Sequence, residues 1–208
     1  MGLSVARAAR ARSLWRRQLN ADTLGGRVTR MRTLSVDRAV IRYARQSDAE
    51  GIARVHIASA DDSLAPLARE WPASDLDRRT KQWEQSLQAA DRLDMVATVA
   101  DQVVGFIGGG PPRQQNIPGG VEIYVVHVVP THRCAGIGGQ LWDLACTTLR
   151  GPAHGPLYLE TLAELPCCTF YDARGGEVLT STAGTFYGGA VTHLVYYWPA
   201  GKPHERRP

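Results

Sequence analysis

The segment VVHVVPTHRCAGIGGQLWDLACTTLR (residues 125–150) joins two periodic patterns through a short glycine-rich stretch. Its β-branched start predicts a strand that stops at Pro130, because proline cannot donate to a β-ladder. Its second half repeats apolar residues on one helical face and then stops at Gly151-Pro152; these residues are Leu141, Leu144, Ala145 and Leu149. Glycines without side chains admit a ligand to the backbone, and the N–H groups at a helix start attract negative charge. The stretch therefore predicts an anion-binding turn.

Two familiar phosphate-binding motifs do not fit this turn. The dinucleotide motif G-x-G-x-x-G fails because Leu141 stands where its third glycine belongs. The P-loop motif fails because no Gly-Lys pair in the chain is followed by Ser or Thr. What remains is Arg-x-x-Gly-x-Gly, running from Arg133 to Gly138 after Val-x-Val-Val-Pro.

The rest of the chain alternates strand and helix patterns in an irregular order. Strands are predicted over residues 39–45, 94–100, 103–110, 121–130, 157–162, 177–182 and 191–198, with a hairpin at Asp101-Gln102. Helices are predicted after Ser47-Asp48 and over residues 71–90, 136–151 and 167–176. The run over 121–130 has one polar break near its end, His127, so we expect a central strand buried on both faces. This order predicts one α/β or α+β domain with a mixed sheet and helices packed on it.

Composition excludes several broad classes. The length of 208 residues suits one domain, and no apolar run approaches the roughly 20 residues that a membrane helix needs. The four cysteines form no CxxC and no zinc-like set with histidines, so we expect no metal. Together these features predict a cytoplasmic protein with reduced thiols.

Charge is unevenly distributed along the chain. Residues 1–36 contain eight arginines and one acidic residue, whereas residues 37–199 contain 18 acidic and 13 basic residues. This pattern predicts an acidic domain over 37–199 between a basic extension (1–36) and a basic tail (200–208). A nucleic-acid-binding domain carries its basic patch on the folded part, so we expect neither a nucleic-acid nor a membrane partner. For the extension, a transit peptide, a basic arm and a poorly ordered leader stay open.

In its setting of strand, Pro130, turn and helix, the Arg133–Gly138 motif resembles the acyl-CoA pyrophosphate loop of the GNAT superfamily of N-acyltransferases. IRYARQSDAEGIARVHIAS (41–59) is similar to the family's first strand and helix, and FYDARGGEV (170–178) resembles a segment late in its fold. The resemblance covers about residues 40–198. It implies a mixed, largely antiparallel sheet of about seven strands, flanked by helices and splayed open at the acyl-CoA site.

The resemblance also implies the donor and its contacts. It implies an acetyl-CoA-dependent N-acetyltransferase, with acetyl-CoA as co-substrate and no metal. The backbone of Val128 and Val129 would pair with the pantetheine amides, as an added strand does. The pyrophosphate would be held by Arg133, Ala135, Gly136, Gly138 and Gly139.

Two residues match the family's catalytic positions. Glu122 corresponds to a carboxylate that many members place on the fourth strand, where it removes a proton from the attacking amine. Tyr171 occupies the usual general-acid position, where a phenol protonates the thiolate of CoA. One departure is Glu164, which stands where the family often has an asparagine that contacts the cofactor.

The acceptor is predicted from charge. Asp61 and Asp62, near Trp71, would attract a polycationic amine, and Tyr124 and Glu164 complete the expected acceptor contacts. An aminoglycoside-type antibiotic, hence a resistance activity, or a polyamine would suit such a site. A protein or peptide acceptor, and a non-catalytic acyl-CoA sensor, are the alternatives. Family members are often dimers, so a homodimer is also compatible with the resemblance.

Overall fold

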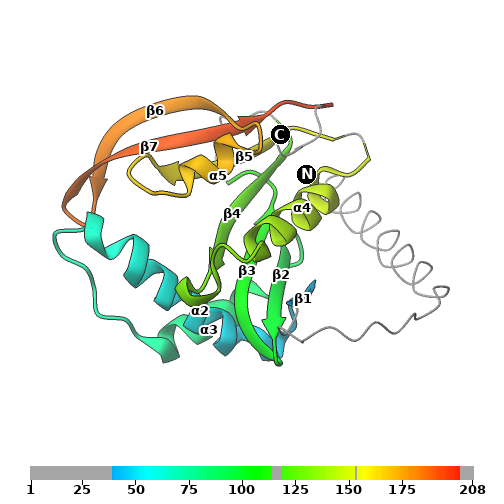
Figure 1. Cartoon of the computed structure of the whole chain (residues 1–208), viewed down its shortest axis with the longest axis vertical. Helices are drawn as coiled ribbons and strands as arrows, with labels where there is room; N and C mark the ends of the chain where they lie inside the picture. The colour runs from blue at the N-terminus through cyan, green and yellow to red at the C-terminus, as the bar shows by residue number, and fades with distance from the viewer. Residues whose placement is uncertain (1–38, 114–118, 153, 202–208) are drawn as a thin grey trace, which may run out of the picture. The chain divides into compact units, whose positions relative to one another are not determined.

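Seven strands form one mixed sheet in the order β1-β2-β3-β4-β5-β7-β6 (Figure 1). The computed structural model describes residues 39–113, 119–152 and 154–201, all within the second of two units, Asp37–Pro208. The predicted extension 1–36 lies outside the described residues, as does most of the predicted tail. All neighbouring strands are antiparallel except β4 and β5, which are parallel and joined through α4.

The strands are β1 (Val40–Tyr43), β2 (Leu93–Val99), β3 (Gln102–Gly110), β4 (Val121–Val128), β5 (Leu157–Leu162), β6 (Glu177–Phe186) and β7 (Gly189–Trp198). The helices are α2 (Ala49–Ser63), α3 (Leu76–Ser86), α4 (Ile137–Arg150) and α5 (Cys168–Asp172). Short 3-10 turns span Gln46–Asp48, Ala65–Leu67 and Pro130–His132. The element order predicted from the sequence is confirmed, and so is the mixed, largely antiparallel seven-stranded sheet.

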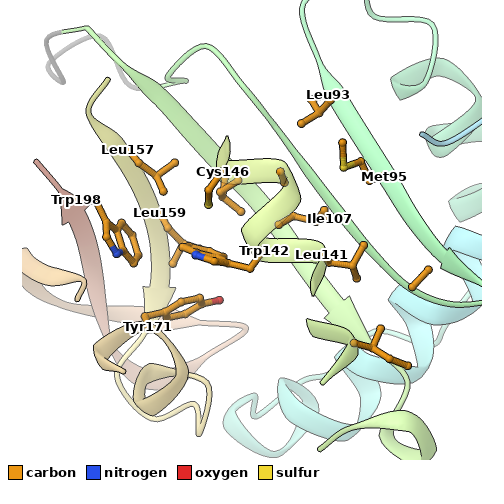
Figure 2. Packing of buried hydrophobic residues seen from close by; sticks show 14 of the residues in the cluster. Leu93, Met95, Ile107, Leu141, Trp142, Cys146, Leu157, Leu159, Tyr171 and Trp198 are labelled. Atoms are coloured by element: carbon orange, nitrogen blue, oxygen red, sulfur yellow. The ribbon is translucent and has the colours of Figure 1, made fainter. Parts of the chain in front are cut away.

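The two faces of the sheet have separate cores. On one face α4 packs over alternate strand residues such as Met95 and Ile107, and Trp142 lies at the centre of this core (Figure 2). On the other face α2 and α3 pack over Val96 and Phe106. Because side chains alternate across a strand, consecutive residues of β2 and β3 pack into opposite cores.

Three local predictions need correction. The hairpin between β2 and β3 turns at Ala100-Asp101, one residue earlier than predicted, and both residues have the positive φ that a two-residue hairpin turn requires. The helix predicted over 71–90 begins only at Leu76, because the Asp75 side chain caps it by accepting from the Arg78 N–H. The helix predicted over 167–176 is limited to five residues, Cys168–Asp172.

Candidate active site

The strands β4 and β5 pair along only part of their lengths. Val121–Ile123 pairs with Leu157–Leu159, and beyond Ile123 no ladder joins them, although β4 continues to Val128 and β5 to Leu162. The prediction that β4 is buried on both faces is therefore wrong for its second half, which is half-buried. This half of β4 presents an unpaired edge, the feature that could receive an extended ligand as an added strand.

A bulge lies where the two strands part. In the β3–β4 ladder Gly108 pairs with Val125 and Gly109 with Ile123, so Tyr124 is the extra residue of β4. A Cβ built on Gly109 would meet Leu149 of α4, whereas one built on Gly110 would meet the Tyr124 hydroxyl. Tyr124 therefore lies on the face of the sheet that α2 and α3 cover.

The main chain at the end of β4 determines which residues face the unpaired edge. Both main-chain groups of Val129 are already bonded, since its N–H donates to Val104 and its carbonyl accepts from His132, each at 2.9 Å. Alternate residues of a strand direct their main-chain groups to opposite edges, so Val126 and Val128 face the unpaired edge. Val128 therefore faces this edge and Val129 does not, and the Val128 carbonyl already accepts from Ser59 Oγ and Arg133 Nε. The pantetheine contacts at Val128 and Val129 stay predictions.

The glycine-rich turn has the geometry of an open helix start. Cys134 and Gly136 have φ values of 60° and 80°, and Gly136 is the N-cap of α4 with no side-chain hydrogen bond to cap it. The N–H groups of the first helical turn have no intrahelical acceptor. The predicted pyrophosphate residues Ala135, Gly138 and Gly139 lie in or beside this turn, so their backbones can be approached by an anion.

Two arginines place positive charge beside the helix start. Arg133 Nη1 is 2.5 Å from Asp62 Oδ2, and its Nε donates to the Val128 carbonyl at 3.1 Å. Arg174 was not predicted: its guanidinium stacks on the Phe170 ring at 3.7 Å, and a Cβ on Gly139 would lie 2.7 Å from its Nη2. The sequence signal that could have found Arg174 is its place three residues after the predicted acid, Tyr171.

The proposed base, Glu122, is buried and closely bound by a residue that the sequence analysis did not single out. Its carboxylate accepts from the Arg113 backbone N–H at 2.7 Å, from Nε at 2.8 Å and from Nη2 at 2.5 Å. The Arg113 guanidinium also lies 4.6 Å from the centre of the Tyr124 ring. Arg113 follows two prolines in a loop, and nothing in that pattern indicates a partner on β4.

Tyr124 lies near two guanidinium groups. Its ring centre is 5.2 Å from Arg92 Cζ and 4.6 Å from Arg113 Cζ. Burial, assisted by repulsion from Glu122, raises the pKa of Tyr124 to about 12. The phenol therefore stays protonated at neutral pH, and its hydroxyl donates to the Pro111 carbonyl at 2.5 Å.

Tyr171, the proposed acid, lies on the other face of the sheet. It is buried against Trp142 of α4, and its hydroxyl points away from Trp198 (Figure 2). Burial is the main reason that the pKa of Tyr171 is raised well above its usual value, and the Cys167 thiol adds to the shift. Tyr171 therefore keeps its proton at neutral pH, as a general acid must.

The other predicted acceptor residues form hydrogen bonds or ion pairs with residues of the same chain. Asp61 accepts from Trp71 Nε1 at 2.7 Å and from Ser74 Oγ at 3.0 Å. Asp62 is the partner of Arg133, and this contact lowers the pKa of Asp62. Glu164 accepts from the Thr192 N–H at 2.9 Å. The structure thus gathers Glu122 and Tyr124 at one place and distributes Asp61, Asp62 and Glu164 among local contacts.

Comparison with known proteins agrees with the fold. Residues 57–175 match the model of the acetyltransferase (GNAT) family, so the chain belongs to this family and is an acetyltransferase. A search of curated protein sequences gave no significant match. In the residues that the structure describes, no helix is long and apolar enough to cross a membrane.

Solved structures of the family share the fold. An N-acetyltransferase from Staphylococcus aureus is 17% identical with a TM-score of 0.63, covering 78% of this chain and 98% of its own. The ribosomal-protein-alanine N-acetyltransferase of Brucella melitensis is 21% identical with a TM-score of 0.62, covering 77% and 99%. The yncA protein of Salmonella typhimurium, solved with its cofactor acetyl-CoA, is 18% identical with a TM-score of 0.60, covering 79% and 97%.

Proposed function

We propose that the chain transfers the acetyl group of acetyl-CoA directly to a primary amine. The observation that carries the proposal is the unpaired edge of β4, which runs from Tyr124 to the open start of α4. The distance along β4 from Val128 to Tyr124 is about 13 Å, at about 3.4 Å a residue. An extended pantetheine arm anchored at the helix start therefore brings its thioester close to Tyr124 and Glu122.

In this proposal the residues on the two faces of the sheet have different roles. Glu122 accepts a proton from the ammonium group of the acceptor, directly or through water, so that the amine can attack. Tyr171 donates a hydrogen bond and then its proton to the departing thiolate. The backbone N–H groups at the start of α4 bind the pyrophosphate, with Arg133 and Arg174 supplying positive charge.

The acceptor remains to be assigned by experiment. A small polycationic amine, such as an aminoglycoside or a polyamine, was predicted from Asp61 and Asp62. Because both carboxylates already have partners within the chain, they give that class little support. A peptide amine is the second candidate, because a structurally similar enzyme is named for a ribosomal-protein alanine.

The test is thiol release from acetyl-CoA across a panel of polyamines, aminoglycosides, amino acids, amino-acid amides and short peptides. We expect release with at least one class, and at least a 100-fold lower kcat in Glu122→Gln with CoA affinity retained. Glu50→Gln, which changes an exposed carboxylate paired with Arg54 on α2, is the matched control. CoA binding without release in the whole panel would support an acyl-CoA sensor instead.

A further inference from the structure

Two ion pairs lie beside Tyr124, together with Asp91, an exposed carboxylate whose charge also acts on the phenol. Arg92 is paired with Asp94 at 2.7 Å, and Arg113 with Glu122 at 2.5 Å. In each pair the carboxylate is the more deeply buried partner. For the second pair, the Arg113 side chain is 54% exposed and that of Glu122 only 5%. A molecule that approaches from solvent therefore meets the Arg113 guanidinium before it can reach the base.

The aromatic rings beside these arginines orient them. Arg92 Cζ lies 5.5 Å from the centre of the Trp83 ring and 5.2 Å from that of Tyr124, so it is in contact range of both rings. Arg113 Cζ lies 4.6 Å from the centre of the Tyr124 ring. The Arg113 guanidinium uses only Nε and Nη2 for its bonds to Glu122, and its Nη1 carries two further N–H donors. Arg113 is thus a fixed and exposed planar donor.

We propose that the acceptor carries a carboxylate near its amine, as a free amino acid does, and that Arg113 binds this carboxylate. The inference rests on the proposed acetyl transfer. A guanidinium matches a carboxylate through two parallel hydrogen bonds, and each hydrogen bond to a charged group is strong. A polyamine, in contrast, would bring further positive charge against Arg92 and Arg113, and like charges disfavour binding.

The same contact explains how Glu122 becomes available. Arg113 donates to both oxygens of Glu122, with its guanidinium on Oε1 and its backbone N–H on Oε2. The substrate carboxylate competes for the Arg113 guanidinium and so releases a Glu122 oxygen. Binding of an acceptor that has a carboxylate therefore frees the Glu122 oxygen that takes the proton from its amine.

The chemical step is balanced. The acceptor ammonium group gives one proton to Glu122, and the neutral nitrogen forms a bond to the thioester carbonyl carbon. The carbon–sulfur bond breaks, and the thiolate takes the Tyr171 proton. The nitrogen then loses its second proton to solvent, leaving the amide and free CoA. Later proton exchange with solvent restores Glu122 and Tyr171.

The experiment compares each amino acid with its own amide, which keeps the amine and side chain but lacks the carboxylate. We expect kcat/KM for thiol release to favour the acid of the best pair at least tenfold. In Arg113→Gln this ratio should fall to about one, because KM rises for the acid far more than for the amide. Arg113→Lys, which keeps the charge but loses the planar fork, should lie between the two.

Arg54→Gln is the matched control, since Arg54 is also exposed and paired with a glutamate. Thermal unfolding checks that each variant is folded. Release confined to amines without a carboxylate, or an equal loss for acid and amide in Arg113→Gln, would overturn this inference while leaving acetyl transfer in place. Release from no amine by a protein that binds CoA would overturn the proposed function itself.

Discussion

Tyr171 can be tested by removing one oxygen atom. Tyr171→Phe keeps the buried ring against Trp142 but leaves the thiolate without its proton donor. We expect kcat for thiol release to fall at least 100-fold, within the usual range for general acids, while CoA affinity is retained. Steady-state kinetics with isothermal titration of CoA measures both quantities.

The matched control is Tyr196→Phe. The Tyr196 hydroxyl donates to Asp172 at 2.7 Å, and its ring centre is 5.4 Å from that of Tyr171. This variant should lose some stability but keep its turnover. If Tyr171→Phe retained the wild-type kcat, Tyr171 would be only a core residue.

Two histidines make the stability of the fold depend on pH. Burial lowers the pKa of His56 to about 4 and that of His127 to about 3, with a smaller contribution from nearby Arg79. The unfolded chain binds protons on these residues below about pH 6.5 and the folded chain does not, so stability is full above that pH and falls as the pH falls. Each histidine should cost roughly 2 kcal/mol by pH 4.5.

Urea denaturation at pH 7.5 and pH 4.5 measures this dependence. His127→Gln should lose less stability between the two pH values than the wild-type chain does. His132→Gln, at a half-buried position of the turn after β4, should keep the wild-type difference. Equal losses in all three chains would show that His127 is not the source.

At the residue scale, the sequence could suggest Glu122 but not its partner. The resemblance to the acetyltransferase family suggests Glu122, because many members place a carboxylate on the fourth strand. Arg113 reaches Glu122 from a loop that follows β3, and neither periodicity nor motif specifies where a loop side chain goes. The bulge in the β3–β4 ladder at Tyr124 also depends on the pairing register. The β4 sequence alone does not indicate this register.

The glycine-rich turn can be tested at the scale of one element, because α4 begins and ends on a glycine with positive φ. Gly136→Ala places a Cβ in the left-handed region at φ 80°, which costs about 1–2 kcal/mol. Because this residue shapes the proposed pyrophosphate site, we expect CoA affinity to fall at least tenfold as well. Gly151→Ala, at φ 62° and ψ −174° in a region that is essentially restricted to glycine, should cost at least as much stability and keep CoA affinity.

Thermal unfolding with and without CoA separates the two effects. Equal weakening of CoA binding by both substitutions would mean that the turn acts only through overall stability.

At this scale the strand and helix order was predictable because hydrophobic periodicity is a local property of the chain. The boundaries of the helices and strands were less predictable. The helix predicted from residue 71 starts at Leu76, since Trp71 and Ser74 are held by Asp61 and the Asp75 cap then sets the start. The half-burial of β4 depends on where β5 departs, which is decided by pairing between segments more than 30 residues apart.

At the scale of the whole molecule, the excess of basic over acidic residues lies in residues 1–36 and not in the segment that contains the described sheet. All seven strands and both cores lie between residues 39 and 198. Removal of residues 1–36 takes away eight arginines and one aspartate, so the formal net charge changes from +4 to −3. We expect the shortened chain to keep the melting temperature, CoA affinity and thiol release of the full chain.

The same pair of chains tests the prediction that nucleic acid is not a partner. Binding to duplex DNA is measured at 50 mM and 200 mM salt. A protein that neutralises several phosphates loses affinity steeply over this range, because bound counterions are released. We expect no such binding by either chain. Steeply salt-dependent binding by the full chain, lost on removal of residues 1–36, would instead make the extension a nucleic-acid arm attached to an acetyltransferase.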